Sequence, residues 1–224
     1  MKRRSHANTI VPLMEAISCL GVVAESLGAN VARLRTGSEP VSVLFTGTEF
    51  GSGTTLMAAS CAAGIATLTG EQVLLVEANM ARPGLGRYAG IGDTPGLEDY
   101  LAGRSSLDDA APYVPGCHGL RVLCATGRGG PNARMSPRAE VKKKLAELVS
   151  SSPFVVFDAP PLHLEPGYSL LLAFVQHAIM VVKARGSLKG DVMRSTELIE
   201  LAGVDLIGSI LNRFKSDVPF SRHE

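Results

Sequence analysis

The chain has 224 residues, of which 46% are hydrophobic and 19% charged, a composition that fits one globular α/β domain and excludes a disordered chain. Its 22 Lys and Arg nearly cancel its 21 Asp and Glu. A net charge of +1 predicts no global attraction to nucleic acid or to an anionic membrane.

Apolar residues between positions 12 and 34 recur at spacings of three and four, which predicts a helix that ends at the Gly- and Pro-containing segment 36–40. The following elements are expected as a strand at 42–45, a Gly/Thr loop at 46–55, a helix at 56–68, a strand at 72–76, an irregular segment at 82–88, a helical turn at 96–103 and a strand at 120–124. The last elements are expected as a helix at 137–149 capped by Ser136, a strand at 154–157, a buried helix and strand within 170–182, a helix at 188–201 and a strand at 206–211.

Strands that alternate with helices predict an α/β fold with a mostly parallel sheet flanked by helices on both faces. Ligands of such folds bind at the carboxyl ends of the strands. No repeat, low-complexity tract or linker divides the chain. We therefore expect an N-terminal helical segment (1–40) packed on the core, one α/β domain (41–214) and a short tail (215–224).

The loop after the first predicted strand has the position of a phosphate-binding loop. Gly51 and Gly53 allow backbone N–H groups to turn inward, and the helix that follows adds its positive N-terminal end. Thr55 could offer a hydroxyl to Mg²⁺. Because the usual lysine is missing, the loop alone is equally compatible with a glycine-rich turn that binds nothing.

Further segments follow in the order expected of a P-loop protein. Residues 76–83 read Val-Glu-Ala-Asn-Met-Ala-Arg-Pro, and residues 154–161 end a buried strand in Asp158, as a Walker B segment does. With Gly-Leu-Glu-Asp-Tyr-Leu-Ala-Gly at 96–103 and Val-Asp-Leu-Ile-Gly-Ser-Ile-Leu-Asn at 204–212, they resemble the bacterial tyrosine autokinases of capsule and exopolysaccharide synthesis. These kinases are relatives of the MinD/ParA ATPases, so the resemblance implies a P-loop NTPase fold with deviant Walker motifs.

The chain departs from this family at residues that carry charge. Thr54 stands where the family has its phosphate-contacting lysine, and Glu49 stands where MinD-type relatives have another lysine. A threonine supplies no cation, and the loss of one preorganised electrostatic contact typically costs about 10²–10³ in rate. In the second motif, Glu77 and Asn79 replace two aspartates and Ala81 replaces an arginine.

The resemblance implies a nucleotide site made by the loop, the second motif and the end of the last strand, with the residues Gly51, Ser52, Gly53, Thr54, Thr55, Arg82 and Asn212. Thr55 and Asp158 would hold Mg²⁺, and ATP or ADP with Mg²⁺ is expected to bind weakly. No catalytic residue is assigned, although Glu77 and Asp158 are the candidates if the chain is active. Simpler roles stay open, namely a cap of the loop for Asp158, a turn residue for Asn212 and a surface ion pair for Arg82.

The features through which the family assembles and phosphorylates itself are missing. Its helical ExxRxxR motif has two candidate registers ahead of the first strand, 15–21 and 25–31, and neither contains an arginine. The tail at 213–224 has no tyrosine that could be phosphorylated. A homo-oligomer stays open.

These observations favour a regulatory or scaffolding relative of the tyrosine autokinases in exopolysaccharide or capsule biosynthesis or export, with weak or no nucleotide turnover. Its expected partner is a membrane-embedded chain-length (co-polymerase) protein or an active kinase, and not nucleic acid. Two alternatives stay open: an active ATP-binding tyrosine kinase or ATPase in which a partner or Arg82 replaces the missing lysine, and a MinD/ParA-type positioning ATPase.

The sequence has no recognisable signal peptide, and its longest apolar stretch, 170–182, is shorter than the about 20 residues that span a bilayer. The four cysteines show no metal-binding spacing and suit a reducing compartment. We expect a cytoplasmic protein that lies at the inner membrane only through a partner.

Overall fold

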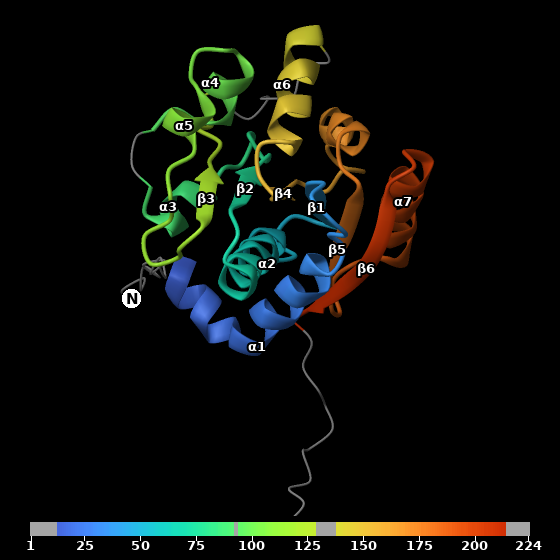
Figure 1. Cartoon of the computed structure of the whole chain (residues 1–224). Coiled ribbons are helices and arrows are strands. Elements are labelled where there is room, and N and C mark those ends of the chain that lie inside the picture. The colour runs from blue at the N-terminus through green and yellow to red at the C-terminus, as the bar shows by residue number, and fades with distance from the viewer. Residues whose placement is uncertain (1–12, 92–93, 129–137, 214–224) are drawn as a thin grey trace, which may run out of the picture.

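The computed structural model describes residues 13–91, 94–128 and 138–213. Its centre is a six-stranded sheet in the order β3-β2-β4-β1-β5-β6 (Figure 1). All strand pairs are parallel. The strands are β1 (Val41–Gly47), β2 (Val73–Glu77), β3 (Leu120–Leu123), β4 (Phe154–Asp158), β5 (His177–Lys183) and β6 (Asp205–Asn212).

Helices connect the strands and cover both faces of the sheet, which confirms the predicted α/β architecture. They are α1 (Leu13–Ala32), α2 (Thr54–Thr69), α3 (Leu85–Ala89), α4 (Leu97–Leu101), α5 (Leu107–Ala110), α6 (Ala139–Val149), the 3₁₀ helix η2 (Pro166–Ala173) and α7 (Lys189–Leu201). Within the described ranges, no helix is long and apolar enough to cross a bilayer.

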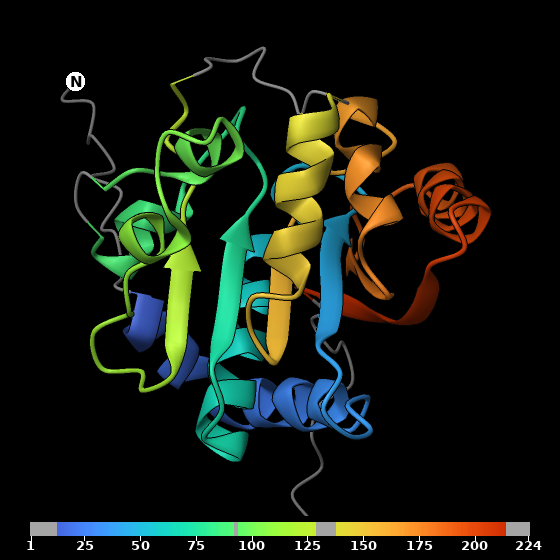
Figure 2. The same ribbon diagram turned by 45° about the horizontal axis from the view of Figure 1, so that its top comes forward.

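Alternate residues of the central strands enter two separate hydrophobic clusters, as expected for a sheet covered on both sides. Val43 and Phe45 of β1 pack with α1 and α2. Leu44 packs on the opposite face with Leu145 of α6. Figure 2 shows α6 over one face of the sheet and α2 behind the other.

Two glycines bring α1 against α2. A Cβ atom on Gly64 would collide with the carbonyl oxygen of Ala24, and one on Gly28 would collide with the backbone of Gly64. The helix that precedes the first strand is therefore packed on the core through close backbone contact.

The predicted elements differ from the structure at the short helices. The segment predicted to be irregular at 82–88 overlaps α3, which spans residues 85–89, and α5 was not predicted. The buried helix predicted from residue 170 onward is the 3₁₀ helix η2. Helix α6 begins at Ala139, while the predicted cap Ser136 lies outside the described residues.

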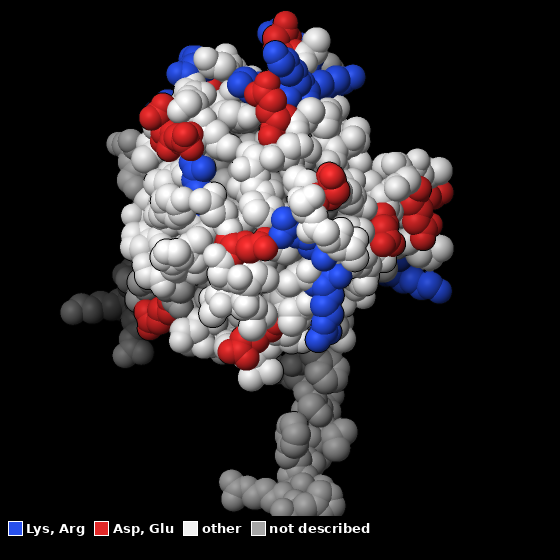
Figure 3. Space-filling model, viewed as in Figure 1, with Lys and Arg blue, Asp and Glu red and all other residues white. Residues whose placement is uncertain are grey.

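Charged side chains of both signs are interspersed over the face shown in Figure 3, with wide uncharged areas between them. This agrees with the net charge of +1.

Candidate functional site

The predicted phosphate loop joins β1 to α2 at the carboxyl edge of the sheet. Gly51 and Gly53 have φ values of 78° and 95°, in the left-handed region that favours glycine. Asn212, at the end of β6, donates a hydrogen bond from Nδ2 to the carbonyl oxygen of Ser52 at 2.7 Å. A Cβ atom at position 53 would collide with the Asn212 side chain. The dihedral angle of position 53 therefore favours glycine, and a larger residue there would have to displace the Asn212 side chain from Ser52.

Two hydroxyl groups of the loop, those of Ser52 and Thr54, are bonded to each other. Ser52 is buried, and its Oγ lies 3.0 Å from Oγ1 of Thr54. Thr54, the residue in the lysine position, thus contributes a neutral polar group at the start of α2. The positive elements of this loop are backbone N–H groups and the N-terminal end of the 16-residue helix.

Asp158 and Thr55 lie together beside the loop. Asp158 ends β4 and is paired in register with Phe45 of β1. The Thr55 hydroxyl is hydrogen-bonded to the carboxylate, and this bond lowers the pKa. Burial is the larger effect, and it raises the pKa of Asp158 to about 7, with a further contribution from the negative charge of Glu77.

The second carboxylate oxygen of Asp158, Oδ2, is buried and has no hydrogen-bond partner among the described atoms. An open acceptor next to a threonine hydroxyl fits Mg²⁺, which prefers oxygen ligands. The described residues contain no group of three or more His, Cys, Asp or Glu that could hold a metal. Thr55 and Asp158 would therefore supply two ligands, while waters and phosphate oxygens would complete the coordination, and the ion would neutralise phosphate charge.

Glu77, the other candidate carboxylate, is occupied by backbone groups. Its Oε1 accepts hydrogen bonds from the N–H groups of Gly84 at 2.6 Å and Leu85 at 2.7 Å, and its Oε2 accepts one from Ala125 at 3.1 Å. Burial raises the pKa of Glu77, and these three bonds oppose the rise. The side chain thereby holds the start of α3 and the chain after β3, a role that the sequence did not predict.

The second motif reaches the loop through Arg82. Its guanidinium carbon lies 3.9 Å from the centre of the Phe50 ring, in a cation–π contact. The turn that carries Arg82 is held by Asn79, whose Oδ1 accepts a hydrogen bond from the Arg82 N–H at 3.3 Å. The hydroxyl of the buried Tyr168 accepts another from the N–H of Ala81 at 3.2 Å. The structure thus brings Arg82 to the loop.

Sequence reasoning missed Lys183, which lies on the other side of the loop. Its Nζ is 3.5 Å from Oε2 of Glu49, the carboxylate in the position of the MinD-type lysine. Lys183 ends β5, the strand next to β1, and no motif marks it. His163, after the Asp158-Ala-Pro-Pro segment, is bonded instead to α7, with Nδ1 3.0 Å from Oγ of Ser195.

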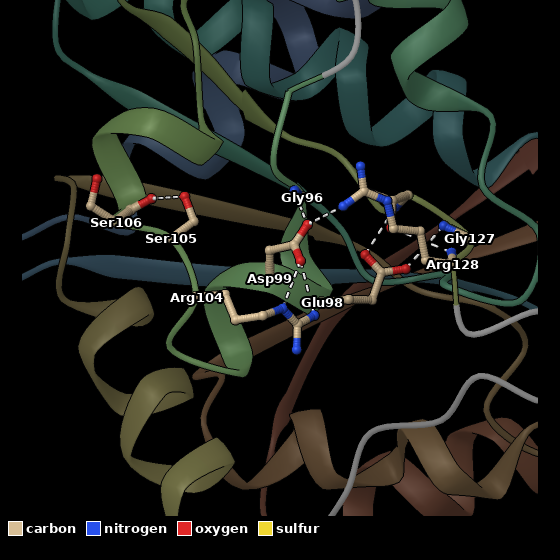
Figure 4. Close-up of polar contacts among 9 residues, drawn as sticks. Gly96, Glu98, Asp99, Arg104, Ser105, Ser106, Gly127 and Arg128 are labelled. Atoms are coloured by element: carbon tan, nitrogen blue, oxygen red, sulfur yellow. Dashed lines mark hydrogen bonds and ion pairs between the residues drawn. The ribbon is translucent and has the colours of Figure 1, made fainter.

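A second polar cluster involves Glu98 and Asp99, two residues of the segment 96–103. Asp99 lies between two guanidinium groups (Figure 4), with Oδ1 2.9 Å from Arg104 and Oδ2 3.0 Å from Arg128. The hydrogen bond from Arg104 is the main cause that lowers the pKa of Asp99. The neighbouring Glu98 accepts hydrogen bonds from the N–H groups of Thr126 and Gly127 at 2.9 and 3.0 Å. The two carboxylates therefore hold α4 against the chain that follows β3.

The architecture is that of a P-loop NTPase. The septum site-determining protein MinD of Pyrococcus horikoshii, solved with Mg-ADP, superposes with a TM-score of 0.62 at 23% identity, over 80% of this chain and 74% of that one. The kinase domain of the Escherichia coli tyrosine kinase ETK superposes with a TM-score of 0.73 at 20% identity, over 98% of this chain and 88% of that one. These similarities establish the fold.

Sequence comparison identifies the homologues more narrowly. The chain is 22% identical over 214 residues to the putative tyrosine-protein kinase CapB of Staphylococcus aureus, covering 94% of this chain and 92% of CapB. It is 30% identical over 175 residues to the putative tyrosine-protein kinase EpsB of Ralstonia solanacearum, covering 76% of this chain but 22% of EpsB. No protein-family model matches the chain. The resemblance to bacterial tyrosine kinases, inferred from the motifs, is confirmed.

Proposed function

We propose that this chain is a degenerate tyrosine-autokinase-like P-loop protein with a regulatory or scaffolding role and weak or no nucleotide turnover. The observation that carries the proposal is the loop itself, in which Thr54 and Glu49 stand at the two positions where relatives have lysine. Phosphoryl transfer depends almost entirely on positioning and on cations around the phosphates. A loop that offers amides and hydroxyls alone is suited to binding more than to transfer.

The carboxylates around the loop support the same proposal. Glu77 uses both oxygens for backbone hydrogen bonds, so it is engaged in holding α3. Asn79 has no carboxylate with which to accept a proton. Among the described residues, Asp158 has a buried carboxylate oxygen without a hydrogen-bond partner, and this oxygen fits a magnesium ligand.

The direct test restores the missing charge. We expect the native chain to hydrolyse ATP, and to phosphorylate itself, at background rates in the presence of Mg²⁺, because no loop cation stabilises the charge that develops on the phosphates. Thr54→Lys is expected to bind Mg-ATP at least about tenfold more tightly and to gain measurable hydrolysis. The measurements are calorimetric titration and phosphate release. Thr54→Gln is the matched control, because it lengthens the side chain without adding charge.

A second candidate function is an active kinase or ATPase whose missing lysine is replaced by another residue. Two observations favour it, namely the contact of Arg82 with Phe50 and the ion pair of Lys183 with Glu49. Magnesium-dependent turnover by the native chain that is lost in Asp158→Asn would establish this alternative and reject the regulatory proposal. A gain confined to Thr54→Lys supports the regulatory proposal.

For its biological setting, we propose a role in exopolysaccharide or capsule biosynthesis or export, through docking to a membrane-embedded co-polymerase or to an active kinase. One relative from Klebsiella pneumoniae, 25% identical over 148 residues, is described as a putative tyrosine-protein kinase in the cps region. The chain would then lie at the inner membrane through its partner. Co-expression of the tagged chain with the co-polymerase and the active kinase of the same organism tests this, and recovery of the chain from solubilised membranes without either protein contradicts it.

A further inference from the structure

Lys183 is placed beside the phosphate loop by the register of the sheet. Strand β5 pairs with β1 so that Val181 lies opposite Gly47, and the N–H of Thr48 donates to the carbonyl oxygen of Val181 at 3.3 Å. The next side chain on the same face of β5 is Lys183, which is 31% exposed. Asp158 of β4 lies on the other side of β1, so the loop has a carboxylate on one flank and an ammonium group on the other.

The turn after β5 encloses the pair formed by Lys183 and Glu49. Oγ of Ser187 accepts a hydrogen bond from the Lys183 N–H at 3.0 Å and donates to Oε1 of Glu49 at 3.3 Å. The same hydroxyl contacts Oγ1 of the buried Thr48. At Gly186, a Cβ atom would lie 2.9 Å from Cδ of Lys183 and 3.0 Å from Oε1 of Glu49. The backbone therefore approaches the ion pair closely.

The end of β6 connects the end of β5, which carries Lys183, to the loop. Asn212 is the register partner of Lys183, and its carbonyl oxygen accepts a hydrogen bond from the N–H of Ala184 at 2.8 Å. Its side chain is bonded to Ser52 in the loop. Two neighbouring strands therefore contact the loop, β5 through the ion pair of Lys183 with Glu49 and β6 through the hydrogen bond of Asn212 to Ser52.

We infer that Lys183 supplies the positive charge that the loop itself lacks, and that Glu49 holds it until the phosphates of a nucleotide displace the carboxylate. This inference rests on the weak nucleotide site of the proposed function. The ion pair has a separation of 3.5 Å, and both side chains are about 30% exposed (31% and 30%), so it is a weak one. A phosphate group carries more charge than a carboxylate, and the flexible four-carbon stem of lysine can follow it.

The test is a set of Mg-ADP titrations by calorimetry on four forms of the full chain: native, Glu49→Gln, Lys183→Met and the double variant. Glu49→Gln is expected to bind at least about tenfold more tightly than the native chain, because Lys183 is released and a repelling charge is removed. Lys183→Met in the Glu49→Gln background is expected to lose at least about tenfold, because there the lysine has no carboxylate left to neutralise.

That last comparison separates phosphate contact from simple neutralisation of Glu49. A change of less than about threefold on removing Lys183 from the Glu49→Gln variant would overturn the inference. Absence of Mg-ADP binding by Glu49→Gln would overturn it as well. Lys183→Arg in the same background should retain binding, since it keeps the charge, and thermal melting of each variant checks that it is folded.

Lys144→Met is the matched control, because Lys144 also forms an ion pair with a glutamate, Glu147 at 2.9 Å on α6, and it has no contact with the loop among the described residues. Its titration should match that of the native chain. The readout is affinity and not turnover. Hydrolysis of ATP by the native chain would therefore reject the proposed function and leave this inference unchanged. Equal Mg-ADP affinities of Glu49→Gln with and without Lys183→Met would reject this inference alone.

Discussion

The burial of Asp158, a candidate magnesium ligand, has a cost in stability. Its carboxyl group is buried at the end of β4, and its pKa is raised from the ordinary 3.8 to about 7. The folded chain therefore binds this proton more tightly than the unfolded chain does. Stability from this group is fully present below about pH 4 and is lost as the pH rises from about 4 to about 7.

Asp158→Asn is expected to stabilise the protein without its ligand at pH 8, because it removes a buried charge and keeps the shape of the side chain. The gain in the free energy of unfolding should be on the order of 2–4 kcal/mol at pH 8 and should approach zero at pH 4, where the native carboxyl is protonated. Urea denaturation at both pH values measures it. Glu200→Gln, an exposed change on α7, should show no such dependence. Lower stability of Asp158→Asn at pH 8 would mean that the ionised form is the better fit.

At the scale of helices and strands, local pattern predicted most of the fold. The strands are runs of mostly apolar residues, and α2 lies between Gly53 and Gly70. The observed ends of these elements lie close to the predicted ones. Helices α3 and α5 are 5 and 4 residues long, too short for a periodicity to appear. Helix α3 depends on a tertiary contact instead, since Glu77 accepts the N–H groups of Gly84 and Leu85 at its start.

The same limit applies to the candidate site. Gly51, Gly53 and Thr55 lie within one segment, so the loop chemistry could be predicted from it. Lys183 could not, because its approach to Glu49 depends on which strand lies beside β1, and that is a property of the whole sheet.

The contact between α1 and α2 gives an element-scale prediction. Gly64→Ala places a methyl group against the carbonyl oxygen of Ala24, and it should force the helices apart. We expect a loss of about 2–3 kcal/mol in the free energy of unfolding, as for an overpacked core. Gly190→Ala is the control, because its added Cβ meets no atom within 4 Å in α7, and it should stabilise slightly. Equal stabilities of the two variants in urea denaturation would show that α1 adjusts freely.

At the scale of the whole molecule, the residues that determine the fold differ from those that determine the chemistry of the loop. A TM-score of 0.73 at 20% identity to the ETK kinase domain shows how much of the architecture survives when most side chains differ. The central strands are continuous buried runs, such as β2 and β4, and this pattern is what a parallel sheet covered on both faces requires. The charges of the loop are not part of this pattern, since Thr54 is not among the buried residues of the core.

The proposed weak nucleotide site has a consequence for the stability of the whole domain. A ligand that binds only the folded chain stabilises it by RT ln(1 + [L]/Kd), so with a Kd of about 1 mM, 5 mM Mg-ADP contributes about 1 kcal/mol. For a domain of this size that raises the Tm by about 2–4 °C. Thr54→Lys should show a larger rise under the same conditions, and Mg²⁺ with sulfate at equal ionic strength is the control. A rise in Tm of about 8 °C or more in the native chain would require a Kd in the tens of micromolar. Such an affinity would mean that a cationic side chain already contacts the phosphates in the native chain.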